Sequence, residues 1–104
     1  MNKSEFIYAC ESMTGAKNLT ISDSDYEIIE VVYAFHPAIS EVRGKEQIAL
    51  IYVTFGMTVI NDMLPRAIKA RELENKISQA KAAYNSAMAE YNSAMAEYNE
   101  LKSK

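Results

Sequence analysis

A seven-residue repeat in the C-terminal third of the chain constrains the fold more than any other feature of the sequence. The segment 84–90 (YNSAMAE) recurs letter for letter as 91–97, and a third copy begins at Tyr98. A period of seven, with a large residue at one position and a small one three later, is the spacing of a helix that packs along its length against another helix. The repeat therefore predicts a long supercoiled helix, and it names neither a ligand nor a reaction.

The repeat lies within a longer stretch that has no helix-breaking residue. No proline or glycine follows Pro65, so we expect one helix to begin there and to run to about residue 102. A helix of this length without an interior stop is typical of a coiled coil. The sequence thus divides into a small acidic helical head, residues 1–64, and a heptad-repeat helix, residues 65–104, which forms a single structural unit with the head.

The first two helices of the head have recognisable boundaries. The first is predicted over about residues 4–13, with Ser4 as its N-cap and Gly15 as its stop. The second is predicted to start at a capping box in residues 24–27. It should end at about Phe35, because a proline at position 37 disfavours helical geometry at the residue before it.

The third helix of the head is predicted over about residues 45–64. Apolar residues lie on two faces of this run, which is typical of a helix at the centre of a bundle. Gly56, in its middle, is expected to allow a close helix approach rather than to act as a hinge. The predicted fold class is therefore all-α: a small three-helix head followed by a long C-terminal helix that forms a coiled coil or a helical-bundle oligomer.

The distribution of charge narrows the classes of partner. Residues 1–64 carry four basic and nine acidic side chains, giving −5, whereas residues 65–104 carry seven and five, giving +2. A general nucleic-acid binder would need a concentrated positive face, so we do not expect one. The longest uncharged stretch, residues 47–61, has 15 residues and is too short to span a membrane comfortably. With a single cysteine and no signal peptide, the expected location is a reducing cytoplasm.

The long helix carries a stripe of tyrosine, alanine and methionine that needs covering. If tyrosine is placed at position a, alanine falls at position d, and methionine lies one residue beyond d. A large residue opposite a small one suits an antiparallel or staggered pair of helices. We therefore expect a homo-oligomer; packing of the stripe onto the head of the same chain, or against a different protein, are the alternatives. The predicted oligomer interface comprises Ile77, Tyr84, Ala87, Met88, Tyr91, Ala94, Met95, Tyr98 and Leu101.

Basic residues gather where the head meets the long helix. This basic neck comprises Arg66, Lys69, Arg71 and Lys76. It could contact an anionic small molecule such as a nucleotide, but contact with the acidic head of a neighbouring chain, or simple solvation, is favoured. No aromatic residue is interleaved to stack on bases, so nucleic acid is not expected there.

The residues that could carry chemistry are better explained by structural roles. His36, the only histidine, could act as a general base, but its position predicts a helix-end residue. Cys10 lies on the apolar face of the first helix and is expected to be a small buried hydrophobe. The acidic residues between positions 23 and 30 do not have the spacing of a calcium loop. We expect no catalytic residue, no metal and no cofactor.

The predicted function is a non-enzymatic protein–protein interaction module that self-associates. In size and composition the chain is similar to small accessory proteins of bacteria and their phages, which implies a regulator or inhibitor that acts by binding another protein. One alternative is a structural assembly component in which the coiled coil sets a spacing. A second alternative is an oligomer that binds an anionic small ligand, such as a nucleotide, through the basic neck.

Overall fold

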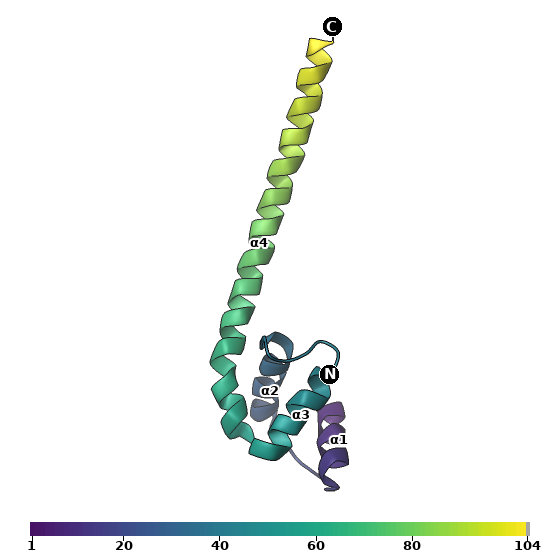
Figure 1. Cartoon of the computed structure of the whole chain (residues 1–104), viewed down its shortest axis with the longest axis vertical. Coiled ribbons are helices and arrows are strands. Elements are labelled where there is room, and N and C mark those ends of the chain that lie inside the picture. Colours follow the sequence, from purple (N-terminus) through teal and green to yellow (C-terminus); the bar gives the residue numbers. More distant parts are fainter. Residues whose placement is uncertain (104) are drawn as a thin grey trace. The chain divides into compact units, whose positions relative to one another are not determined.

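The computed structural model describes residues 1–103 and contains four helices and no strand in that range (Figure 1). The elements are α1 (Lys3–Thr14), α2 (Asp23–Phe35), α3 (Gly44–Phe55) and α4 (Met57–Lys102). The prediction of an all-α fold with a long C-terminal helix is therefore confirmed. The chain divides into two compact units: an N-terminal unit, Met1–Arg71, and a C-terminal unit that begins at Glu72.

The first two helices each begin with a different cap from the one predicted. Asn2, not Ser4, caps α1, because its side chain accepts a hydrogen bond from the Glu5 N–H at 2.8 Å. Ser22, not Ser24, caps α2, and it accepts a hydrogen bond from the Asp25 N–H at 3.2 Å. Both predictions were wrong by two residues. In each case a polar residue earlier in the chain takes the extended conformation that a cap requires.

The start of α2 is fixed by packing as well as by its cap. Ile21 immediately precedes the cap, and Tyr26 lies one turn into the helix; both side chains are buried in the core. This pair is a hydrophobic staple, which sets the angle at which the chain enters a helix. Since a serine at position 24 has no such apolar neighbour directly before it, the packing favours the earlier cap.

The ends of α1 and α2 are those predicted. Gly15 follows α1 with φ 72°, in the left-handed region where glycine meets no steric penalty, and its N–H donates to the Glu11 carbonyl. His36 follows α2 in an extended conformation, as expected for the residue before a proline.

The boundary between α3 and α4 lies at Gly56, and the prediction of one helix over residues 45–64 was wrong. Gly56 has φ 69° and ψ −158°, a conformation that essentially only glycine adopts. No atom lies within 4 Å of the position that a Cβ would occupy, so close approach does not explain the glycine. Gly56 instead gives the chain a sharp change of direction between the two helices.

Pro65 lies inside α4 instead of starting a helix. Its ring nitrogen cannot donate to the Asn61 carbonyl, and an interior proline costs about 3 kcal/mol or more. Asn61 and Pro65 are both exposed, so water can satisfy the free carbonyl. Pro65 is the ninth residue of this 46-residue helix. The helix tolerates the proline because packing holds the turns on either side of it.

The core of the N-terminal unit forms around α3, which contacts both α1 and α2. Phe6 on α1 is fully buried and stacks edge-on against Tyr52 of α3, with ring centroids 5.6 Å apart. The buried residues come from all four helices and from the segment before α2. They are Phe6, Cys10, Ile21, Tyr26, Ile29, Val32, Ile48, Ala49, Ile60 and Ala67.

The first turns of α4 complete this core. Ile60 and Ala67 have no exposed surface, and Leu64 and Ile68 line a groove together with residues of α2. The guanidinium of Arg71 lies 5.8 Å from the ring centroid of Phe35 on α2. Because these contacts continue past residue 64, the compact unit extends to Arg71.

Candidate functional site

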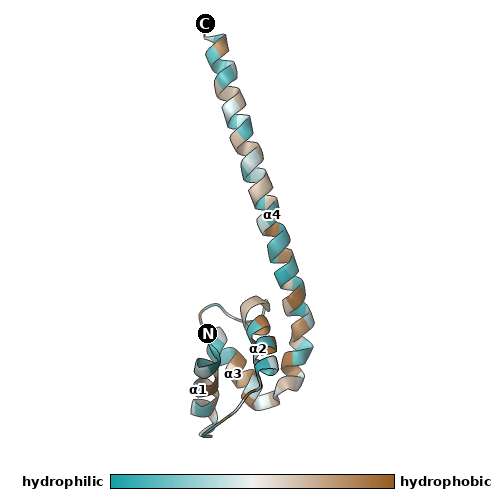
Figure 2. Cartoon of the chain, turned by 180° about the vertical axis from the view of Figure 1, so that it is seen from behind, coloured by the Kyte–Doolittle hydropathy of each residue, from teal (hydrophilic) through white to brown (hydrophobic). Residues whose placement is uncertain are grey.

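The strongest candidate surface is an apolar stripe on the C-terminal unit, which is a single helix. Every residue from 72 to 103 is exposed. Along this part of α4 hydrophobic residues recur among hydrophilic ones (Figure 2). The exposed fractions are 64% for Tyr84, 59% for Tyr91 and 57% for Tyr98. Three exposed tyrosines at intervals of seven on a helix are unusual for a chain that remains alone in water.

The methionines extend the stripe in a regular pattern. Met88 follows Tyr84 by four residues and precedes Tyr91 by three, and Met95 repeats this spacing before Tyr98. Residues three and four apart are neighbours on a helix surface, so these side chains form one continuous row. We call the row of Ile77, Tyr84, Met88, Tyr91, Met95 and Tyr98 the tyrosine–methionine stripe.

Alanine borders the stripe on one side and asparagine on the other. Ala87 and Ala94 come three residues after a tyrosine, whereas Asn85 and Asn92 come one residue after it. All are exposed. Short side chains beside large ones let a second helix come close without a steric clash. The predicted interface residues are thus all on one side of the helix except Leu101, which lies at the far edge of the alanine border.

A lysine lies on the same side of the helix near each end of the stripe. Lys81 occupies the position between Ile77 and Tyr84, and Lys102 follows Tyr98 by four residues. The Lys102 ammonium lies 5.7 Å from the ring centroid of Tyr98, which is the geometry of a cation–π contact. The tyrosine ring therefore accepts a lysine as a neighbour on this face.

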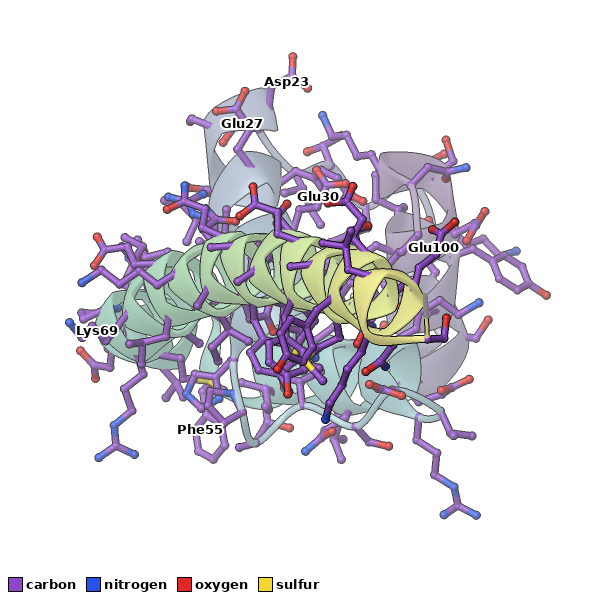
Figure 3. The ribbon with its side chains drawn as sticks, turned by 90° about the horizontal axis from the view of Figure 1, so that it is seen from above. Asp23, Glu27, Glu30, Phe55, Lys69 and Glu100 are labelled. Carbon is purple, nitrogen blue, oxygen red and sulfur yellow. The ribbon has the colours of Figure 1, made fainter. Side chains whose placement is uncertain are left out.

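The structure does not gather the basic neck into one cluster. Arg71 is half-buried and its guanidinium faces the ring of Phe35 on α2, whereas Arg66 and Lys69 are exposed. Lys76 belongs to the C-terminal unit. Figure 3 shows Lys69 at the periphery of the molecule. Of the four predicted contact residues, Arg71 already has a packing role.

His36 has the structural role expected of a helix-end residue, but its ring is not held as a cation. It is buried, and its Nδ1 accepts a hydrogen bond from the Ala38 N–H at 3.0 Å. Burial lowers the pKa of His36, and the positive charge of Arg66 lowers it further. A histidine ring is attracted to the negative C-terminal end of a helix only in its charged form, so this attraction does not hold the neutral ring of His36.

Cys10 is a buried side chain, as predicted. Its exposed fraction is 0%, and burial raises the pKa of its thiol to about 11, with a smaller contribution from the charge of Glu11. The thiolate, which is the reactive form, is therefore almost absent at neutral pH.

The acidic residues of α2 form a solvated helix start. Asp23 makes an ion pair with Lys3 at 2.7 Å, which lowers the pKa of the Asp23 carboxyl. Asp23 and Glu27 project outward from α2 (Figure 3). Within residues 1–103, no group of three or more histidine, cysteine, aspartate or glutamate side chains is placed to hold a metal ion.

One further surface was not predicted from the sequence. Met13 at the end of α1 and Leu50 on α3 are exposed and line a shallow groove of about 400 Å³. The rest of its lining is Ser40, Arg43, Glu46 and Gln47. Leu50 lies within the apolar run of α3 and is nevertheless exposed. The composition of that run gives no signal that separates Leu50 from the buried positions.

None of the helices in the described part of the chain is both long and apolar enough to cross a membrane. Comparison of the chain with protein-family models, with curated proteins and with solved structures finds no match. The geometry of the exposed stripe is therefore the basis for the functional proposal.

Proposed function

We propose that this protein is a non-enzymatic interaction module that associates with itself through the tyrosine–methionine stripe. The observation that supports the proposal is the exposure of six large apolar side chains on one side of a single helix. Burial of a side chain of this size contributes about 1.5 kcal/mol or more. Summed over the stripe, this free energy exceeds what pairing of two helices needs in order to occur at micromolar concentrations.

The two residues considered for catalysis support the non-enzymatic part of the proposal. The Cys10 thiol is buried and protonated, and the Nδ1 atom of His36 already accepts a backbone hydrogen bond. Each residue contributes to packing in the N-terminal unit. Neither is placed to act on a substrate in solution.

The alternative of an anion-binding oligomer has less support. Arg71 contacts Phe35, which leaves Arg66 and Lys69 as the exposed residues of the basic neck that belong to the N-terminal unit. The alternative of a structural assembly component uses the same stripe as the main proposal. It predicts rings or filaments in place of small closed oligomers.

Sedimentation velocity on the full chain tests the proposal. The wild-type protein should sediment as a closed oligomer at tens of micromolar. Replacing Tyr84, Tyr91 and Tyr98 together by glutamate should make it monomeric, with the dissociation constant raised about 1,000-fold or more. Helicity should also fall, because an isolated helix of this kind is marginal in water.

A matched control places the same three charges on the opposite side of the helix. Gln79, Ser86 and Ser93 repeat with the same period and are exposed. Their replacement by glutamate should leave the sedimentation coefficient unchanged. A wild-type chain that stays monomeric at 100 μM, or a tyrosine variant that sediments like the wild type, would refute the proposal.

A further inference from the structure

We infer that the partner of the stripe is a second copy of this chain in antiparallel orientation, centred between Ala89 and Glu90. This inference rests on the proposed self-association and adds its orientation and register. Three properties of the C-terminal unit support it: the facing pairs that each orientation creates, the positions of the charges, and the apolar area available.

The facing pairs differ between the two orientations. In a parallel, in-register pair each residue of the stripe meets its own copy, so Lys81 faces Lys81 and Lys102 faces Lys102. These like charges would be brought together at an apolar seam, which is destabilising. In the antiparallel arrangement each position faces one at equal distance on the other side of the centre. Met88 then faces Tyr91, and Tyr84 faces Met95.

The antiparallel pairing gives both lysines a suitable neighbour. Lys81 faces Tyr98 of the other chain, and Lys102 faces Ile77. Tyr98 already has a lysine, Lys102 of its own chain, 5.7 Å from its ring. A tyrosine ring is attractive to an ammonium group on its face, and a long lysine stem can cover apolar surface while its charge stays in water.

The alanine border leads to the same register. If the seam is drawn through tyrosine and alanine instead of tyrosine and methionine, Tyr91 faces Ala87, Tyr84 faces Ala94 and Ile77 faces Leu101. These pairs are symmetric about Ala89, half a residue from the first centre. Tyr84 and Tyr91 therefore each meet a methionine or an alanine, and large side chains fit beside small ones.

The available apolar area is sufficient for a specific dimer. An aromatic side chain buries about 150–250 Å². At exposed fractions between 57% and 64%, the three tyrosines offer roughly 300–450 Å² per chain. Two chains with their methionines and Ile77 therefore bury more than about 1,000 Å², which is the lower limit for a biological interface.

Spin labels at four exposed sites on the outer side of the helix test the inference. Cysteine is introduced singly at Gln79, Ser86, Ser93 or Glu100 of the full chain, and the distance between the two labels of a dimer is measured by pulsed electron resonance. Wild-type protein treated in the same way controls for labelling of buried Cys10. Sedimentation of each labelled sample first establishes that it contains two chains.

The antiparallel register predicts two classes of distance. The labels at residues 79 and 100 are offset from their copies by about 32 Å along the axis, and those at residues 86 and 93 by about 10 Å. The labels at residues 79 and 100 should therefore give clearly longer distances than the labels at residues 86 and 93. The distance measured at residue 79 should equal the distance measured at residue 100. Any parallel pair gives the same offset at all four sites, and that result would overturn the inference while leaving self-association intact.

Three other outcomes are also decisive. An antiparallel pair with another centre would make the distances at residues 79 and 100 unequal, which would overturn the register. A monomer in sedimentation would overturn the proposed function and with it this inference. A mass of more than two chains would overturn the two-chain interface.

Discussion

Replacing Gly56 by alanine should destabilise the N-terminal unit by about 1–3 kcal/mol. Gly56 has φ 69° and ψ −158°, in a region that side chains with a Cβ avoid. A non-glycine residue held there costs about 1–3 kcal/mol. No atom lies within 4 Å of the added methyl group, so the cost is conformational and does not include a clash with a neighbour.

The single cysteine provides an assay specific to this unit. Cys10 is fully buried in the core, so a thiol reagent reaches it only when the unit opens. When the unit recloses faster than the reagent reacts, the labelling rate is proportional to the population of the open state. Each 1.4 kcal/mol lost from the free energy of opening raises that population about tenfold. The variant Gly56→Ala should therefore be labelled about 5- to 150-fold faster than the wild type. Protein concentration is held constant, because self-association also stabilises the folded chain.

Two controls separate this effect from a general loss of stability. The first control is substitution of Gly15, which has φ 72° and ψ 3°, in the left-handed helical region. Gly15→Ala should cost about 1–2 kcal/mol, and Gly15→Asn should be better tolerated. Thr54→Ala, at an exposed position of α3, should stay within about 0.5 kcal/mol of the wild type. Equal labelling rates for Gly56→Ala and Thr54→Ala would refute the assignment of the helix boundary to Gly56.

Two further predictions concern the ends of α2. Ser22→Ala should lower the free energy of unfolding by about 1 kcal/mol in urea, whereas Ser24→Ala should have little effect; the reverse order would contradict the observed cap. Because the folded-state pKa of His36 is lowered from 6.5, the unfolded chain binds a proton more readily. The contribution of His36 to the free energy of unfolding is complete above pH 6.5, and it should be lost as the pH falls through the lower folded-state pKa. The variant His36→Gln should show a smaller decline between pH 7.5 and 5, and an unchanged decline would mean that other groups cause it.

The candidate surface follows from the sequence to an unusual extent, because the repeat itself dictates which residues share a side of the helix. The tyrosines and methionines predicted for the interface are exposed on α4. The basic neck was less predictable. Arg71 contacts Phe35, a residue 36 positions earlier in the chain, and spacing along the sequence carries no information about that contact.

The buried side of α2 also could not be predicted from residue spacing alone. The spacing indicates one apolar face made of Ile28, Val31, Val32 and Phe35. Val32 is fully buried, but so is Ile29, which lies outside that face, whereas Ile28 is only partly buried. The helix packs against α3 and also borders α4, so its apolar surface is wider than one stripe. Periodicity identifies an amphipathic helix, but the number of neighbouring helices decides how much of it is covered.

The sequence by itself determined the helical class, the stops at Gly15 and before Pro37, and the long C-terminal helix with its repeated face, because all of these depend on conformational preferences within a few residues. Tertiary structure decided where α3 ends. Gly56 and Pro65 are both plausible breaks by local preference, and only one is used. The change of direction at Gly56 lets Ile60 and Ala67 enter the core, and this burial outweighs the cost of a proline inside α4.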